Sequence, residues 1–311
     1  MQQKNEAASP QQVWGIAMGG EEHAEYLWFD GEIVPWGQAM VHVTHIEVAV
    51  PSHLFEGIRA YWNNEAERLY IFCLEAHMRR FAQGMKLMRM QPRVSIGDIR
   101  RGIIDLLQAN GERTNTYIRP FAFKNEPGPV MSNPRLGTPA TVVIYTVPFT
   151  PKLDGEEVVS ACVSSWRRIS DNVMPARVKA GANYRNSQLA SAEAQLNGYD
   201  LPIFLNSGDK VCESSRSCLM IVRDGVVITP PVTAGILESV TRAVLIQLCR
   251  EVLGLQVVER EVDRTELYIA DEAFFCATGA EIMPIGSIDK FTVGDGKLGP
   301  ITRKLRAAYK Q

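Results

Sequence analysis

The 311-residue chain lacks the patterns that define several large classes of protein. No apolar run approaches the roughly 18 residues of a membrane-spanning helix, and no charged-then-apolar signal pattern stands at the N-terminus. Lys and Arg (33) nearly balance Asp and Glu (35), so there is no overall basic field to attract nucleic acid. We therefore expect small-molecule partners, no nucleic acid and no membrane.

Cysteine pairs of the CxxC type are also missing. The six cysteines stand mostly inside apolar runs, at Cys73, Cys162, Cys212, Cys218, Cys249 and Cys276. Isolated cysteines in apolar surroundings are typical of reduced, buried thiols, which favours a cytoplasmic protein.

Common catalytic and metal-binding signatures are absent as well. The chain has no GxSxG, no P-loop and no GxGxxG followed by a suitable acid, and it has no internal repeat. His42 and His45 have a spacing that metal sites use, but no cysteine or carboxylate completes a ligand set. We predict two structural histidines and no metal.

What is present is enough hydrophobic sequence, 46%, to bury a sizeable core, and the length suggests two domains. Residues 1–25 are polar and read as a tail. The run from Pro148 to Gly155 breaks the strand pattern, so we place a linker at 148–157 between a small domain, 26–147, and a larger one, 158–311.

Several elements carry clear local signals. Asp30-Gly31 between two apolar runs predicts a hairpin. Ser95 and Gly111 bracket an amphipathic helix, and helical spacing over 74–90 predicts another, which carries Arg80. The longest predicted helix runs from near Ser239 to Gly254.

Lys179 is the candidate reactive group. It stands beside Val178, Ala180 and Gly181 with no adjacent carboxylate, and desolvation disfavours an ammonium ion. A lysine that loses its proton readily can form a Schiff base with a carbonyl cofactor or substrate. The alternative is an ordinary solvated lysine.

The chain resembles the class IV (fold type IV) pyridoxal-phosphate aminotransferases, most closely the branched-chain amino-acid aminotransferases. The resemblance spans Tyr26 to Tyr309. Its motifs are Trp28-Phe29-Asp30-Gly31, Val41-His42-Val43, Phe55-Glu56-Gly57-Ile58-Arg59, His77-Met78-Arg79-Arg80-Phe81, Tyr117-Ile118-Arg119-Pro120, the stretch from Ser164 to Tyr184, and Ala277 to Pro284. It implies a two-domain α/β (α+β) fold, with a small N-terminal α/β domain and a larger C-terminal domain that has a mixed, barrel-like sheet.

The resemblance implies pyridoxal 5′-phosphate as the cofactor and assigns residues to it. Lys179 would be the Schiff-base lysine and would move the proton between substrate and cofactor. Tyr184 would donate to the phenolic oxygen O3′. Glu213, 213 − 179 = 34 positions after the lysine, would pair with the pyridine nitrogen.

The phosphate dianion needs a fork of donors and a helix N-terminus. Arg80 would supply the guanidinium. The backbone of Val240 and Thr241 would supply the helix start, and Thr278 a hydroxyl. The alternatives are a surface salt bridge for Arg80 and a simple turn hydroxyl for Thr278.

On the substrate side the sequence partly departs from the family. Tyr117 and Arg119 are retained, and in the family they lie near the substrate carboxylate. Gly279, in the Ala277 to Pro284 motif, is a further candidate for substrate contact. The family's Tyr-Gly before Phe-Glu-Gly is missing, whereas His53 and Lys152 are added. After Glu213 the usual Gly-x-x-x-Asn is replaced by 214–218, Ser-Ser-Arg-Ser-Cys. These changes suggest a more polar pocket and a donor other than simply leucine, isoleucine or valine.

The resulting hypothesis is ping-pong transamination of an L-amino acid with a 2-oxo acid by a homodimer or a higher homo-oligomer. Two other enzymes share the fold: a D-amino-acid or (R)-amine transaminase, and an aminodeoxychorismate lyase. The altered 214–218 segment also leaves open a catalytically silent protein that binds the cofactor.

Overall fold

The computed structural model describes residues 23–125 and 139–311, and these form two compact units. The described part of the smaller unit comprises 23–125, 139–150 and 178–182, and that of the larger unit comprises 151–177 and 183–311. The chain changes unit at Thr150–Pro151, within the expected linker, and the short segment Val178–Ala182 belongs to the smaller unit. The domain limits 26–147 and 158–311 stay a prediction, and the expected tail falls almost wholly outside the described residues.

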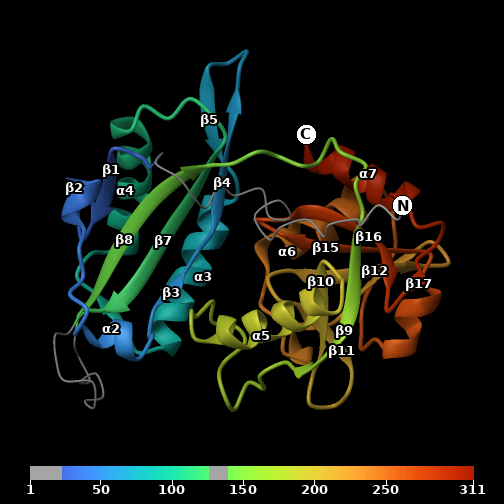
Figure 1. The fold of residues 1–311 in the computed structure, drawn as a ribbon. Helices are drawn as coiled ribbons and strands as arrows, with labels where there is room; N and C mark the ends of the chain where they lie inside the picture. Colours follow the sequence, from blue (N-terminus) through green and yellow to red (C-terminus); the bar gives the residue numbers. More distant parts are fainter. Residues whose placement is uncertain (1–22, 126–138) are drawn as a thin grey trace, which may run out of the picture. The chain divides into compact units, whose positions relative to one another are not determined.

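The smaller unit is built on one sheet in the order β2-β1-β8-β7-β4-β5, with β3 added to β7 and β6 to β8 (Figure 1). Its strands are β1 (Tyr26–Phe29), β2 (Glu32–Pro35), β3 (Leu54–Phe55), β4 (Ile58–Asn63), β5 (Arg68–Ile71), β6 (Gln91–Pro92), β7 (Thr116–Lys124) and β8 (Pro139–Pro148). Its helices are α2 (Ile46–Ala49), α3 (Leu74–Leu87) and α4 (Ile96–Ala109), with a 3-10 turn at Trp36–Gln38. Helix α4 packs on β1, β2 and β8, and α3 packs on α4 and β3.

Two elements of this unit, the Asp30-Gly31 turn and the helix capped by Ser95, were predicted from local sequence signals. Phe29 pairs with Glu32, so Asp30 and Gly31 form the two-residue turn, and both have positive φ (46° and 111°). Ser95 caps α4 and exchanges bonds with Asp98 in a capping box. Both predicted elements are confirmed.

The larger unit contains a second sheet that closes on itself. The order is β11-β10-β9-β16-β15-β12-β13-β14, and β11 also pairs with β12 through Glu213 and Cys218. A path that returns to its first strand is a barrel, as the resemblance implies. The strands are β9 (Val159–Arg167), β10 (Leu201–Leu205), β11 (Val211–Ser214), β12 (Cys218–Arg223), β13 (Val226–Thr229), β14 (Val257–Glu259), β15 (Glu272–Ala277), β16 (Glu281–Ile288) and β17 (Phe291–Thr292).

Helices pack against this sheet: α5 (Asn183–Leu196) on β9 and β10, α6 (Val240–Gln247) on β15, and α7 (Pro300–Tyr309) on β15 and β16. Short 3-10 turns occupy Val232–Ala234 and Arg264–Ile269. The long helix expected from Ser239 to Gly254 has two parts, because α6 continues after Gln247 as a π-helical stretch, Leu248–Val252. Among the described residues no helix has the length and apolar character to cross a membrane.

Candidate active site

The segment that carries Lys179 is attached to β3 of the smaller unit. Ala180 forms an antiparallel bridge with Leu54, the Phe55 amide donates to the Lys179 carbonyl (3.0 Å), and the Gly181 amide donates to the His53 carbonyl (2.8 Å). The segment thus behaves as one more short strand. Lys179 itself is half-buried.

The ring of Phe55 contacts two cationic side chains, Lys179 and Arg119. Its ring centroid is 4.9 Å from Lys179 Nζ and 4.1 Å from Arg119 Cζ. Cations over an aromatic ring are attracted by its quadrupole. Phe55 was recognised only as part of a motif, so its contact with both Lys179 and Arg119 was not predicted.

Arg80 projects from α3 and is held by a buried carboxylate. Glu56 accepts from Arg80 Nε (2.7 Å), from Arg80 Nη2 (2.6 Å) and from His77 Nδ1 (2.8 Å). Burial would raise the pKa of Glu56, but the charges of Arg80 and His77 and their hydrogen bonds lower it to about 2. A fixed anion therefore orients the Arg80 guanidinium.

Tyr117 and Arg119 alternate along β7 and so lie on the same face of the strand. Tyr117 is buried and its hydroxyl lies against Gly57, where an added β-carbon would be 1.8 Å away. His53 binds Glu47 through Nδ1 at 2.6 Å. Five of the predicted residues, Lys179, Arg80, Tyr117, Arg119 and His53, therefore belong to the smaller unit.

In the larger unit, Glu213 on β11 is buried, and each of its carboxylate oxygens has a protein partner. Its Oε1 is 2.8 Å from Arg168 Nη2, and its Oε2 accepts from the Leu237 amide at 3.0 Å. Arg168 is also buried. The sequence showed Arg168 only as half of a basic pair, so this ion pair was not predicted.

The chain from Leu237 leads directly into α6. The Ser239 hydroxyl caps the helix by accepting from the Arg242 amide (3.2 Å). Val240 and Thr241 occupy the first turn, where amides have no carbonyl partner within the helix and the helix dipole is positive. Such a turn is suited to an anion.

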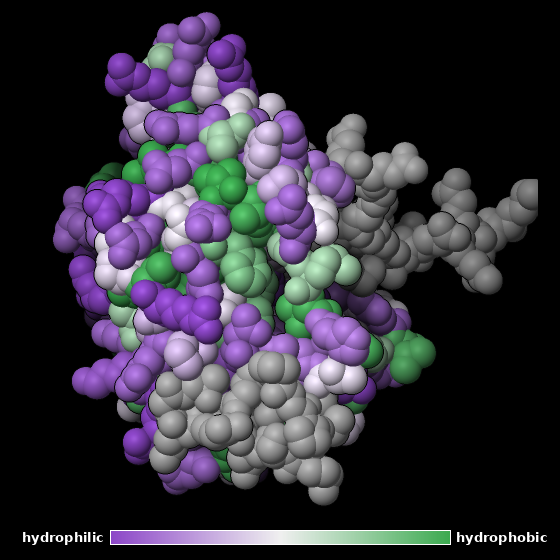
Figure 2. Space-filling view, turned by 90° about the vertical axis from the view of Figure 1, so that its left-hand side faces the viewer, coloured by the Kyte–Doolittle hydropathy of each residue, from purple (hydrophilic) through white to green (hydrophobic). Residues whose placement is uncertain are grey.

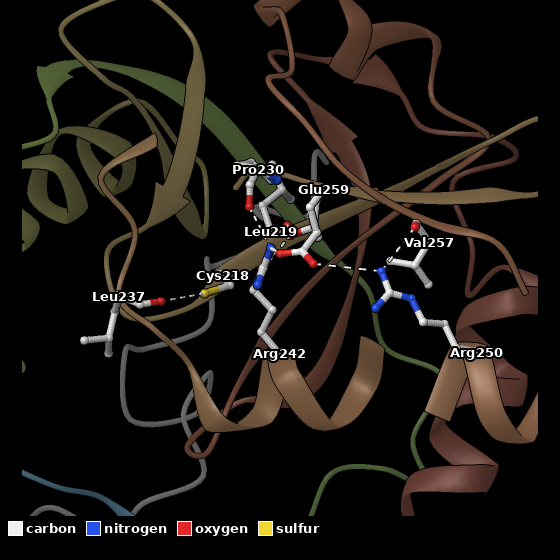
Figure 3. Close-up of polar contacts among 9 residues, drawn as sticks. Cys218, Leu219, Pro230, Leu237, Arg242, Arg250, Val257 and Glu259 are labelled. Carbon is white, nitrogen blue, oxygen red and sulfur yellow. Dashed lines mark hydrogen bonds and ion pairs between the residues drawn. The ribbon is translucent and has the colours of Figure 1, made fainter. Parts of the chain in front are cut away.

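Arg242 fixes the rest of α6 to the edge of the sheet (Figure 3). Its buried guanidinium donates to Thr229 Oγ1 (3.1 Å), to the Pro230 carbonyl (2.9 Å) and to Glu259 Oε2 (2.8 Å). Figure 3 also shows Cys218 bonded to the Leu237 carbonyl, and Arg250 reaching Glu259 from the other side. Buried contacts therefore hold both the entry to α6 and its first turns.

Thr278 and Gly279 form the half-buried turn between β15 and β16. Glu281, directly after it, has φ of 54° and is fully buried, and it accepts from the Lys152 amide at 2.8 Å. The backbone of Lys152 is thereby fixed near this turn. Tyr184 lies half-buried in the first turn of α5.

The two histidines with metal-like spacing bind protein groups. His42 contacts Thr44, and His45 Nε2 is 2.7 Å from Asn125 Oδ1. Within 23–125 and 139–311, no group of three His, Cys, Asp or Glu side chains is placed to hold a metal ion.

A buried carboxylate–arginine pair, a capped helix start and a half-buried lysine are a set of groups that a phosphorylated aldehyde cofactor requires. The family described as amino-transferase class IV matches residues 53–288, and the chain belongs to this family. Class IV aminotransferases depend on pyridoxal 5′-phosphate, and so does this enzyme, which is a transferase of amino groups.

The chain is similar to several branched-chain-amino-acid aminotransferases. The enzyme of Salmonella typhimurium is 36% identical over 92% of both chains. A structure of the enzyme from Thermobaculum terrenum in its PLP form is 48% identical, with a TM-score of 0.88 over 93% of this chain and 94% of that one. A structure from Thermoproteus uzoniensis with norvaline is 39% identical, with a TM-score of 0.86 over 92% and 94%.

Proposed function

We propose that the enzyme transfers the amino group of branched-chain L-amino acids to a 2-oxo acid by a ping-pong mechanism. The similarity to branched-chain aminotransferases over more than nine-tenths of the chain supports this substrate class. The similar enzymes named above are branched-chain aminotransferases, which favours this class over a D-amino-acid or (R)-amine transaminase and over a lyase. The intact set of polar groups argues against a silent protein.

Bound pyridoxal 5′-phosphate supplies a ring that accepts the electrons left when the substrate loses its α-proton. Lys179 would hold the cofactor, and its Nζ would take the substrate α-proton and return it. Glu213, paired with Arg168, would face the protonated ring nitrogen, and Tyr184 would donate to the phenolic oxygen.

Arg80, the amides of Val240 and Thr241, and the Thr278 hydroxyl would hold the phosphate of the cofactor. Glu56 accepts from Nε and Nη2 of Arg80 and so fixes the plane of the guanidinium. A guanidinium fork and a helix start are both matched to a dianion.

The observation that carries the proposal is the attachment of Lys179 to β3, which presents a half-buried amine in a fixed segment. The test is borohydride reduction of the cofactor-loaded enzyme followed by peptide mapping. We expect the reduced cofactor on Lys179, and loss of the label in Lys179→Ala with the fold intact. A label on another lysine would refute the assignment.

Because His53, Lys152 and residues 214–218 depart from the family, the enzyme is also to be tested for a preference for an amino donor with a polar or anionic side chain. Arg119 and Tyr117 are proposed to bind the substrate carboxylate. Gly279, in the Thr278 turn, and Lys152, whose backbone is fixed near it, are further proposed substrate contacts. Adding single amino acids of both chiralities and following the cofactor absorbance separates the two cases. Fast conversion by L-leucine confirms the branched-chain class, and inert leucine with another active donor would replace it.

We further propose a homodimer or a higher homo-oligomer that works in the cytoplasm. The smaller unit exposes several large apolar side chains, and Figure 2 shows hydrophobic residues exposed among hydrophilic ones. The exposed apolar side chains of this unit are, among others, those of Met40, Val41, Val43, Val48 and Val50. All six cysteines are free thiols, which fits a reducing compartment. Light scattering at micromolar concentration tests the assembly, and a monomer mass would refute it.

A further inference from the structure

His53 stands next to the reactive-lysine segment, and its ring is fixed by Glu47. Glu47 accepts four hydrogen bonds from two neighbouring residues: from the Ser52 amide (2.8 Å), the Ser52 hydroxyl (2.6 Å), the His53 amide (3.0 Å) and His53 Nδ1 (2.6 Å). One carboxylate therefore defines both the backbone turn at 52–53 and the direction of the imidazole.

The state of Glu47 determines which nitrogen of His53 carries hydrogen. Burial would raise the pKa of Glu47, but the hydrogen bonds from His53 and Ser52 outweigh burial and lower it. A carboxylate only accepts, so Nδ1 is the donor, and Nε2 is at the opposite edge of the ring. The ring is thus held with its Nε2 edge turned away from Glu47.

That edge lies against Gly181. A β-carbon built on Gly181 would be 2.1 Å from His53 Nε2 and 2.2 Å from Cε1. Such distances are far below van der Waals contact, so only glycine allows the imidazole to lie here. The Gly181 amide also donates to the His53 carbonyl, so ring and backbone of one residue hold the same glycine.

The contacts continue to Lys179 itself. Phe55, two residues after His53, contacts the lysine twice: its amide donates to the Lys179 carbonyl, and its ring faces Lys179 Nζ. The His53 and Phe55 rings are 6.2 Å apart. A shift of His53 would therefore be transmitted to the lysine through the backbone on both sides of Leu54.

We propose that His53, oriented by Glu47, is a positioning residue that holds the Lys179 segment on β3, and that Gly181 is the position that admits its ring. This inference rests on the proposed role of Lys179. It gives His53 a task different from the substrate contact expected from the sequence.

Comparing the affinities for two forms of the cofactor distinguishes a misplaced Lys179 from a general loss of structure at the site. Pyridoxal 5′-phosphate has an aldehyde that reacts reversibly with a lysine amine, whereas pyridoxamine 5′-phosphate has an amine and cannot. We expect His53→Ala and Glu47→Gln to weaken binding of the aldehyde form by about tenfold or more and that of the amine form by less than about threefold. His42→Ala, at an exposed histidine of the same stretch, should leave both affinities unchanged.

A second pair of variants tests the contact itself. Gly181→Ala should lower both the melting temperature and the affinity for the aldehyde form, and adding His53→Ala should restore most of both losses. Equal weakening of the two cofactor forms in His53→Ala and Glu47→Gln, or no weakening, would overturn the proposal. So would a double variant as impaired as Gly181→Ala. Wild-type enzyme that fails to trap the cofactor on Lys179 would instead refute the proposed function.

Discussion

Gly57 and Tyr117 are in such close contact that a β-carbon at position 57 would lie 1.8 Å from the Tyr117 hydroxyl and 2.6 Å from its Cζ. The glycine of the Phe55–Arg59 motif is therefore needed for the position of a neighbouring ring, since its φ is not among the positive values of the chain. Tyr117 is buried on β7, directly across from Arg59.

Replacing Gly57 by Ala should therefore displace Tyr117 and impair substrate binding. We expect kcat/KM for the amino donor to fall by about tenfold or more, because a misplaced contact residue loses its alignment with the substrate. Steady-state kinetics measure this loss. In a Tyr117→Ala background the same substitution should have little further effect, and an undiminished effect there would show that Gly57 acts through another group.

The buried Glu56 predicts how stability depends on acid pH. Burial opposes its ionisation, but Arg80 and His77 lower its pKa from 4.5 to about 2. Because the folded pKa is depressed, the stabilisation is fully present above about pH 4.5 and is lost as the pH falls toward 2. A shift of this size corresponds to roughly 3 kcal/mol.

Urea unfolding of wild type and Glu56→Gln at pH 6 and at pH 3 measures this contribution. The glutamine variant should be less stable at pH 6, since it leaves a buried arginine without its counter-charge. The difference between the two proteins should shrink at pH 3. A difference that stays constant with pH would mean that Glu56 is not the titrating group.

Local signals accounted for much of the fold. The Asp30-Gly31 turn and the Ser95 cap are encoded within a few residues, so they could be predicted without knowing the rest of the chain. The helix from Ser239 was predicted at its start, where the cap is local. Its change to π-helical bonding after Gln247 has no such signal.

Partners from distant parts of the chain could not be predicted. Arg168 meets Glu213 only because β9 and β11 flank β10, a register that no local pattern specifies. Lys179 was found from its motif, but its attachment to Leu54 and Phe55 depends on a long-range strand pairing. The Glu47–His53 contact is short-range, yet it forms across an irregular segment that contains Pro51 and has no hydrophobic periodicity.

Two glycines of α4 provide a matched test of packing. A β-carbon at Gly102 would lie 2.5 Å from Trp28 Cε2 and Nε1, whereas one at Gly97 would meet only the Ser95 hydroxyl at 3.5 Å. Gly102→Ala should destabilise the protein by about 1–3 kcal/mol through overpacking against the indole. Gly97→Ala should be neutral or stabilise by up to about 1 kcal/mol, since alanine favours the helix. Thermal unfolding of both variants measures the contrast, and equal effects would contradict it.

Arg242 and Glu259 should matter for the phosphate of the cofactor rather than for its ring. Their buried pair, with Thr229 and the Pro230 carbonyl, fixes the first turns of α6, whose amides at Val240 and Thr241 are the proposed phosphate ligands. In Arg242→Lys the planar fork is lost, and one ammonium cannot reach all three acceptors.

We therefore expect Arg242→Lys to weaken binding of pyridoxal 5′-phosphate by about tenfold, and binding of unphosphorylated pyridoxal by less than about twofold. Arg250→Lys is the control, because Arg250 is half-exposed and is 3.9 Å from Glu259. Fluorescence or absorbance titration with both ligands gives the two constants. Equal loss for pyridoxal and its phosphate would mean that Arg242 stabilises the unit as a whole and does not position the start of α6.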